Sequence, residues 1–269
     1  MHLGISSYSY TWSVGVPGYF QEKRLSAFDL IEKAVQSGVH IVQFADNLPL
    51  HDLSNNELKR LLDYASERGI QIEAGSRGLT YENLIRYIEI AKILRSPILR
   101  MVIDAKGIEP SLKECIATVK SIVPVLADTG IRLAIENHDR FRAADFALII
   151  TETDPDWTGI CLDTVNSLGA GEGIKEVVGA LAPFTINLHV KEFIIKRVWH
   201  SMGFVIEGLP AGEGMLNIPW LVDEISKFKI CESAILELWT PPEKHIDQTI
   251  KKEEQWVKES IRFLKPYFN

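Results

Sequence analysis

The amino-acid sequence predicts an α/β fold of eight strand–helix units, and three observations support this prediction. Eight short apolar runs recur along the 269 residues, at an average separation close to one strand, one helix and two loops. The runs are continuous rather than alternating, as in a parallel sheet covered on both faces. Most intervals between them show helical periodicity. Eight such units close as a (β/α)8 barrel, or TIM barrel, with strand centres near Ile5, Ile41, Ile72, Leu99, Leu133, Ile160, Ile186 and Ile235.

The strands are expected where each apolar run lies between turn residues. The first run, Leu3–Ser7, opens the chain, and the aromatic residues Tyr8 and Trp12 follow it. The second ends in Asp46 and the fourth in Asp104, so polar side chains stand at strand ends along much of the chain. The eight strands are expected at residues 3–7, 40–45, 70–75, 98–103, 133–136, 159–163, 185–189 and 234–237.

The helices carry recognisable start and stop signals. Ser26 is expected to cap a helix that ends at Gly38. Ser54 with Glu57 three residues later forms a capping box, and Gly69 ends that helix. Further helices are expected at about residues 80–94 and 111–129, whereas no convincing helix pattern lies between the seventh and eighth strands.

That last connection contains an insertion at about residues 194–216. Its mixture of aromatic, basic and glycine residues suits a lid or hairpin over the barrel mouth, with Arg197, Trp199 and His200 near a substrate. A surface feature or a contact between two copies of the chain is the alternative. Residues 1–269 are otherwise expected to form a single TIM-barrel domain.

Composition excludes several function classes. The net charge is −7, from 29 basic and 36 acidic residues, which provides no basic surface for nucleic acid. The three cysteines are unclustered, as in a reducing compartment. No charged and apolar leader and no membrane-span-length run are visible, so we expect a cytoplasmic protein with no membrane partner. The sequence leaves open whether copies of this chain associate into a homo-oligomer.

Four strand ends each supply one residue that can bind a metal ion. Glu136 and Asp163 are 27 positions apart, Asp163 and His189 are 26 apart, and His189 and Glu237 are 48 apart. One βα unit takes roughly 25–30 residues, so the first three lie in register and the last follows one unit plus the insertion. Three carboxylates and one imidazole suit Mn²⁺, Mg²⁺, Co²⁺ or Zn²⁺ rather than a thiolate-bound metal. The sequence therefore predicts one divalent ion.

This ligand set favours proton transfer at a carbon next to a carbonyl. Functional side chains in such barrels gather at the carboxyl ends of the strands. Glu136 and Glu237 come from strands three units apart, so a substrate on the metal ion would lie between them. We expect both glutamates to act as catalytic acid and base as well as metal ligands.

The chain resembles the sugar isomerase/epimerase superfamily with xylose-isomerase-like barrels, along essentially its whole length. The resemblance rests on Ile135-Glu136-Asn137-His138, Cys161-Leu-Asp163-Thr-Val-Asn166, Leu188-His189-Val-Lys191-Glu192, Gly212-Glu213-Gly214 and Leu236-Glu237. Ketohexose 3-epimerases, hydroxypyruvate isomerase and inosose-processing enzymes belong to this superfamily. The resemblance implies the same four metal ligands, Glu136, Asp163, His189 and Glu237, with both glutamates as acid/base.

Two positions depart from the ketohexose epimerase pattern. Asn166 stands where those enzymes have a substrate-binding histidine, three residues after the metal-binding aspartate. Arg142 stands where they have a glutamate, six residues after the first metal-binding glutamate. Arg142, with Arg140, either binds a carboxylate or phosphate of the substrate or forms a solvated surface pair.

Several further residues are candidate substrate contacts, each with a structural alternative. His138 either contacts substrate or caps the chain, and Lys191 either contacts a substrate oxygen or is exposed. Arg100 lies within a strand and is expected to pair with a carboxylate inside the barrel, for example Glu73. The full set of candidate substrate-binding residues is His138, Asn166, Lys191, Arg142, Arg197, Tyr8 and Trp12.

The leading functional hypothesis is a divalent-metal-dependent isomerase or epimerase of a small keto-sugar, sugar phosphate or oxidised derivative. A lyase or dehydratase acting on a 3-keto-glycoside or inosose would use the same site, and the sequence does not separate the two. An abasic-site endonuclease requires more clustered histidines and a basic surface. A non-catalytic sugar-binding barrel is disfavoured because both glutamates are present.

Overall fold

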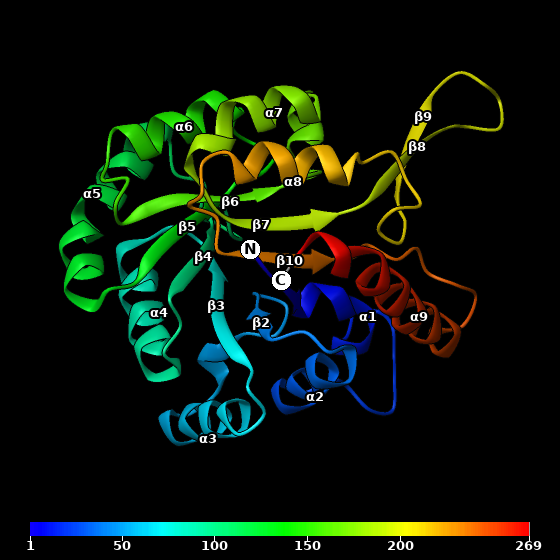
Figure 1. Ribbon diagram of the computed structural model, residues 1–269, viewed down its shortest axis with the longest axis horizontal. Helices are drawn as coiled ribbons and strands as arrows, with labels where there is room; N and C mark the ends of the chain where they lie inside the picture. The colour runs from blue at the N-terminus through cyan, green and yellow to red at the C-terminus, as the bar shows by residue number, and fades with distance from the viewer. Residues whose placement is uncertain (269) are drawn as a thin grey trace.

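The computed structural model describes residues 1–268, and its centre is a closed barrel of eight parallel strands in the order β1-β10-β7-β6-β5-β4-β3-β2. Every neighbouring pair is parallel, so the predicted (β/α)8 fold is confirmed. Figure 1 shows the strands surrounded by helices. The strands are β1 (His2–Ser6), β2 (Ile41–Phe44), β3 (Gln71–Arg77), β4 (Ile98–Val102), β5 (Arg132–Glu136), β6 (Thr158–Asp163), β7 (Thr185–Lys191) and β10 (Ser233–Glu237).

The helices begin and end where local chemistry predicts. Ser26 accepts a hydrogen bond from the backbone N–H of Asp29, and Gly38 ends that helix in the left-handed region at φ 62°. Ser54 and Glu57 form the predicted capping box. The helices are α1 (Thr11–Val14), α2 (Ala27–Ser37), α3 (Asn55–Ser66), α4 (Tyr81–Leu94), α5 (Leu112–Thr129), α6 (Ala143–Thr151), α7 (Ile174–Leu181), α8 (Ile218–Ser226) and α9 (Ile246–Leu264).

The connection between β7 and β10 contains a helix that the sequence analysis did not predict. Helix α8 has nine residues and buries only Ile218, Leu221 and Ile225. Three buried positions over nine residues, with Pro219 in the first turn, are a weak periodic signal. Asn217 caps the helix by accepting from the Trp220 N–H, which is the feature that could have revealed it.

The predicted insertion forms an antiparallel hairpin of β8 (Phe193–Arg197) and β9 (Phe204–Gly208), which make a separate two-stranded sheet. The hairpin extends beyond the ring of helices (Figure 1). Glu192 anchors its base, because its carboxylate accepts from the N–H groups of Phe193, Gly212 and Leu216. Its two ends are therefore held at the barrel wall while its turn reaches outward.

The barrel interior is polar at mid-height, unlike the apolar layer between the strands and the helices. Gln43 on β2 bonds to Asn187 on β7, and two strands separate β2 from β7 in the barrel order. That hydrogen bond therefore crosses the inside of the barrel. Glu73 belongs to the same fully buried group. No helix within residues 1–268 is long and apolar enough to cross a membrane.

Candidate metal centre and substrate pocket

The four predicted metal-binding residues converge at one end of the barrel. Glu136, Asp163 and Glu237 are the last residues of β5, β6 and β10, and His189 is aligned with Asp163 in the neighbouring strand. All four are buried. The Nδ1 atom of His189 lies 3.5 Å from Glu136 Oε2, 4.0 Å from Asp163 Oδ2 and 3.5 Å from Glu237 Oε1.

These residues fit a divalent cation. Within residues 1–268, His189 Nδ1 and Asp163 Oδ2 are buried and have no hydrogen-bond partner. Leaving a buried polar atom unpaired costs about 1–3 kcal/mol, more for a charged group. The ligand atoms of Asp163, His189 and Glu237 lie within 4.8 Å of one another, as do those of Glu136, Cys161 and His189. A cation among the three carboxylates would satisfy both unpaired atoms.

Lys191 reaches into the same cluster. Its Nζ atom lies 2.7 Å from Asp163 Oδ2 and 2.9 Å from Glu237 Oε2, although the contact with Asp163 lacks hydrogen-bond geometry. Burial lowers the pKa of Lys191, but the charges of these carboxylates outweigh it and raise the pKa above its ordinary value. Burial raises the pKa of Glu237, whereas the neighbouring His189 and the charge of Lys191 lower it to about 2. For both Lys191 and Glu237, the neighbouring charges therefore outweigh the effect of burial.

Arg100 is a second cation in this cluster and is buried, and its partner differs from the predicted one. Its Nε donates to Glu136 Oε2, and its Nη1 lies 3.3 Å from Asp46 Oδ1. Glu73, the partner suggested from sequence, instead accepts from Gln43 at 3.0 Å. The strand register explains the difference, because Arg100 aligns with Gly75 on β3 and Ala134 on β5. Glu136 lies two residues from that level toward the carboxyl ends of the strands, and Glu73 lies two residues toward their amino ends.

Glu136 is bonded through both of its oxygen atoms. Asn166 Nδ2 donates to Oε1 at 2.9 Å, and the Arg100 guanidinium occupies Oε2. The backbone N–H of Asn166 also donates to Asp163 Oδ1 at 2.8 Å. Hydrogen bonds between a guanidinium and a carboxylate are among the strongest in proteins. Asn166 therefore orients two of the candidate ligands at once.

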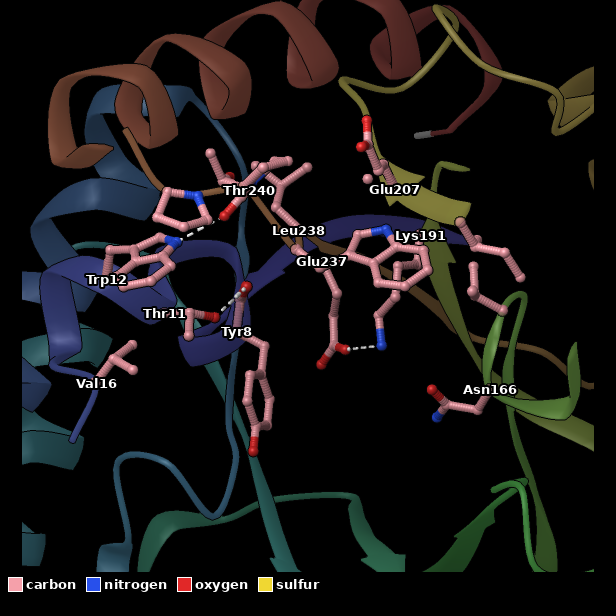
Figure 2. Close-up of a pocket in the computed structure, with 16 residues that line it drawn as sticks. Tyr8, Thr11, Trp12, Val16, Asn166, Lys191, Glu207, Glu237, Leu238 and Thr240 are labelled. Atoms are coloured by element: carbon pink, nitrogen blue, oxygen red, sulfur yellow. Dashed lines mark hydrogen bonds and ion pairs between the residues drawn. The ribbon is translucent and has the colours of Figure 1, made fainter. Parts of the chain in front are cut away.

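Two cavities open beside this cluster, and Tyr8, Asn166, Lys191 and Glu237 line both. The smaller cavity, of about 180 Å³, is polar and is also lined by Asp46, Arg77, Arg100, Val102, Glu136 and His138. The larger, of about 540 Å³, is mainly apolar. Figure 2 shows Lys191 pointing toward Glu237, with Trp12 and Leu238 on the apolar side. Trp12 is fixed by a hydrogen bond of 2.7 Å from its Nε1 to the carbonyl of Thr240.

A family description of xylose isomerase-like TIM barrels matches residues 31–267. The chain belongs to the xylose isomerase-like TIM barrel family. The match covers most of the barrel and all four candidate metal ligands.

A curated relative and two solved structures are similar over nearly the whole chain. The 3-oxo-isoapionate decarboxylase of Pectobacterium atrosepticum is 29% identical over 274 residues, covering 100% of this chain and 98% of the relative. The D-psicose 3-epimerase of Clostridium cellulolyticum, solved with D-tagatose, has a TM-score of 0.75 at 15% identity, with 100% of each chain covered. A xylose isomerase-like barrel protein of Mycobacterium smegmatis, in complex with magnesium, has a TM-score of 0.68 at 13% identity, covering 97% of each chain. At these identities the two solved structures establish the shared fold alone.

Five of the predicted substrate-binding residues line the two cavities of this protein. They are Tyr8, Trp12, His138, Asn166 and Lys191. Tyr8 donates to Asp46 Oδ2 at 3.1 Å, and His138 Nδ1 lies 2.6 Å from Asp139 Oδ1. Both side chains therefore have protein partners of their own at the edge of the polar cavity. The expected position of His138 on the Glu136 side of the mouth agrees with this placement.

Arg142 and Arg197 do not reach either cavity, so the structure corrects both predictions. Arg142 lies at the N-terminus of α6, on the surface. Arg197 lies over the ring of Phe204, at 4.4 Å, and donates to the carbonyl of Ser201. The hairpin directs Arg197 away from the barrel, and Trp199 at its turn is 94% exposed. Instead, β9 contributes Ile206 and Gly208 near its end to the larger cavity.

Sequence reasoning missed the part of the pocket that comes from the second, third and fourth strands. Asp46 follows β2, Arg77 ends β3, and Arg100 lies within β4, and all three line the polar cavity. The signal was present, because each stands at or near the carboxyl end of a predicted strand. Apart from Tyr8 and Trp12 after the first strand, the sequence analysis placed the site in the half of the mouth formed by the later strands.

Proposed function

We propose that the protein is a divalent-metal-dependent lyase that decarboxylates a small 3-oxo sugar acid. The observation that carries this proposal is the charge of the polar cavity. Arg77, Arg100 and Lys191 face the carboxylates of Asp46, Glu136, Asp163 and Glu237. With a divalent ion bound and the histidines neutral, five positive charges face four negative ones. The excess of one positive charge suits a substrate that carries one carboxylate.

The similarity to a decarboxylase supports the same chemistry. The relative at 29% identity acts, by its name, on a 3-oxo acid, and the similarity spans the full length of both chains. In a 3-oxo acid the ketone lies two carbons from the carboxyl carbon. When the bond to the carboxyl carbon breaks, CO₂ leaves and the electron pair passes to the ketone oxygen. The neighbouring carbon then takes up one proton.

The residues of the pocket have distinct roles in this proposal. A bound divalent ion would supply positive charge that stabilises the ketone oxygen as it becomes negative. Glu136, Asp163, His189 and Glu237 would hold that ion. Lys191 lies beside two of these residues and borders both cavities, so it is placed to donate a hydrogen bond to the same oxygen. Arg77, whose side chain is 41% exposed, is placed to bind the substrate carboxylate at the cavity entrance.

The test is CO₂ release from 3-oxo sugar acids of four to six carbons, with Mg²⁺ or Mn²⁺ and with chelator. We expect release only with the ion, and loss of release in His189→Asn. Arg77→Gln should raise KM by about tenfold or more with a smaller effect on kcat, because its ion pair with the substrate carboxylate is made in the bound substrate and weakens as that group becomes neutral CO₂. Metal-dependent turnover of neutral keto-sugars, without any CO₂ from acids, would contradict the proposal.

A second candidate is the isomerase or epimerase activity expected from the sequence. It is favoured by one observation, that the carboxylates of Glu136 and Glu237 both line the polar cavity. The two glutamates would then exchange a proton with the carbon beside the ketone. Turnover of keto-sugars in D₂O distinguishes the candidates. Deuterium at that carbon with the carbon skeleton intact would indicate the isomerase, and loss of one carbon the lyase.

A further inference from the structure

The imidazole ring of His189 has a hydrogen-bond partner at Nε2, the nitrogen on the opposite side of the ring from the carboxylates. Its Nε2 atom lies 2.7 Å from Oε1 of Gln43, and neither residue has exposed surface. The contact joins β7 to β2 across the barrel interior, between residues 146 positions apart. Gln43 is a hydrogen-bond partner of this nitrogen, whereas Nδ1 on the other side has no partner within the described residues.

The orientation of the Gln43 amide is set by its own neighbours. Its Nε2 atom lies 3.0 Å from Glu73 Oε2 and 3.1 Å from Asn187 Oδ1, and both of these atoms are acceptors. A flipped amide would place the Gln43 oxygen against two acceptors and its NH₂ group against the imidazole. The oxygen of Gln43 is therefore directed at His189.

The Asn187 amide is fixed in the same way. Its Nδ2 donates to Ser233 Oγ at 2.7 Å and to Glu73 Oε2 at 3.3 Å, and its Oδ1 accepts from the Cys161 thiol at 3.0 Å. A single assignment of donors and acceptors therefore satisfies all the hydrogen bonds in this group. Glu73, which accepts from both amides, sets the direction of the whole chain of hydrogen bonds.

This arrangement determines which nitrogen of His189 carries hydrogen. An amide oxygen accepts, so Nε2 must donate and must carry the hydrogen. In the neutral ring Nδ1 then has a free lone pair. That lone pair faces Glu136, Asp163 and Glu237 at 3.5–4.0 Å, which is the position of a metal-ion ligand rather than of a hydrogen-bond donor.

We propose that Gln43 and Glu73 are positioning residues that fix His189 with hydrogen on Nε2 and thereby present Nδ1 to a divalent ion. The inference rests on the metal ion of the proposed function but on no particular substrate. A merely structural network would satisfy buried polar groups without affecting the ring's hydrogen or the affinity for the ion. Metal-binding histidines commonly depend on such outer partners, whose loss typically costs 10–100-fold in affinity.

The first measurement is the position of the hydrogen in the wild-type protein. Side-chain ¹⁵N spectra of the seven histidines assign His189 by the signal lost in His189→Asn. We expect a slowly exchanging hydrogen on Nε2 in both metal-free and Mg²⁺-loaded protein at pH 8.5, above the pKa of about 7 to which burial raises Glu73. A neutral ring with its hydrogen on Nδ1 would overturn the inference. The metal-free spectrum decides this point even if the proposed function fails.

The second measurement is Mn²⁺ affinity in matched variants. Gln43→Leu removes the acceptor, so we expect hydrogen on Nδ1 in part of the molecules and affinity 10–100-fold weaker than wild type. The double variant Gln43→Glu, Glu73→Gln exchanges the carboxylate and the amide, keeping the charge and an acceptor that faces His189. We expect it to restore hydrogen to Nε2 and to recover most of the affinity.

Comparing the two variants distinguishes a positioning role of Gln43 and Glu73 from a general effect on folding. Circular dichroism and thermal melting of both variants establish that the barrel is intact. Wild-type affinity and an unchanged ring hydrogen in folded Gln43→Leu would contradict the proposal. If Gln43→Leu does not fold, the exchanged double variant decides: hydrogen on Nε2 with near-wild-type affinity supports positioning, and hydrogen on Nδ1 opposes it.

Discussion

Arg100 and Glu136 lie inside the barrel with almost no exposed surface, and each neutralises part of the charge of the other. Asp46 is the second carboxylate within 4 Å of the Arg100 guanidinium. Removing two charges from water is costly, so such a pair is stable only when each ion keeps its partners. At this position the pair holds the Glu136 carboxylate beside the candidate metal site.

Replacing Arg100 by Met should destabilise the metal-free protein by about 3–5 kcal/mol, because Glu136 would remain buried without its partner. Chemical denaturation measures this change. The double variant Arg100→Met, Glu136→Gln removes both charges and should recover much of the loss. Equal destabilisation in the single and double variants would show that the ion pair does not matter.

Trp12 is one of the aromatic residues that line the larger cavity, and its hydrogen bond to Thr240 holds it there. Trp12→Ala should raise KM for the substrate by about tenfold or more, because a buried aromatic surface contributes roughly 1.5–3 kcal/mol. Trp12→Phe keeps an apolar ring and should raise KM less. Steady-state kinetics on both variants test this, and an unchanged KM in Trp12→Ala would place the substrate entirely in the polar cavity.

Among the elements, the hairpin β8–β9 is the segment suited to act as a lid. Its inner end lines the larger cavity through Ile206 and Gly208, and its turn is exposed. We expect residues 194–216 to exchange amide hydrogens faster without ligand than with bound substrate analogue. Hydrogen exchange with mass spectrometry measures this, with α3 on the far part of the ring as internal control. Equal protection in both states would contradict closure.

Helix α9 is tied to α1 through Glu253. Its carboxylate accepts from the N–H groups of Trp12 and Ser13 and from the Ser13 hydroxyl. Burial nevertheless raises the pKa of Glu253 to about 7, with a further contribution from the charge of Glu254. Folding therefore favours the protonated form of this group.

The sign of the pH dependence follows from this raised pKa. The stabilising contribution is complete below the unfolded pKa of about 4.5 and is lost as the pH rises to about 7. Relative to Glu253→Gln, the wild type should lose up to roughly 3 kcal/mol of stability between those pH values. Denaturation of both proteins at pH 4.5, 6 and 8 measures the difference. Parallel pH profiles would show that Glu253 does not titrate in this range.

For the whole molecule, the divalent ion should couple directly to stability. The candidate ligands come from β5, β6, β7 and β10, so an ion among them joins half of the barrel. Binding to the folded state alone stabilises by about 2.7 kcal/mol at a free concentration of one hundred times Kd. We expect Mg²⁺ or Mn²⁺ to raise Tm and chelator to reverse the change. His189→Asn should melt at the same temperature with and without the ion, whereas an ion-dependent Tm in that variant would contradict the site.

The sequence by itself determined the barrel and most of its element boundaries. Strand positions follow from apolar runs, and helix ends follow from local signals such as Ser26, Gly38 and Ser54, which act through bonds to residues a few positions away. The convergence of Glu136, Asp163, His189 and Glu237 was also predictable, because parallel strands place their carboxyl ends at one edge. Helix α8 was missed because its short and interrupted apolar face carried too little periodicity, and the four-residue helix α1 was not predicted either.

The tertiary structure alone decided which residues meet inside the barrel. Arg100 pairs with Glu136 rather than Glu73 because of the register of β4 against its neighbours, which no local pattern specifies. The contact of Gln43 with His189 spans 146 positions and forms only when the barrel closes. Similarly, Arg197 lies outside the pocket because the hairpin extends away from the mouth. Local sequence sets the elements, whereas pairing across the closed barrel sets the partners of the charged and polar groups within it.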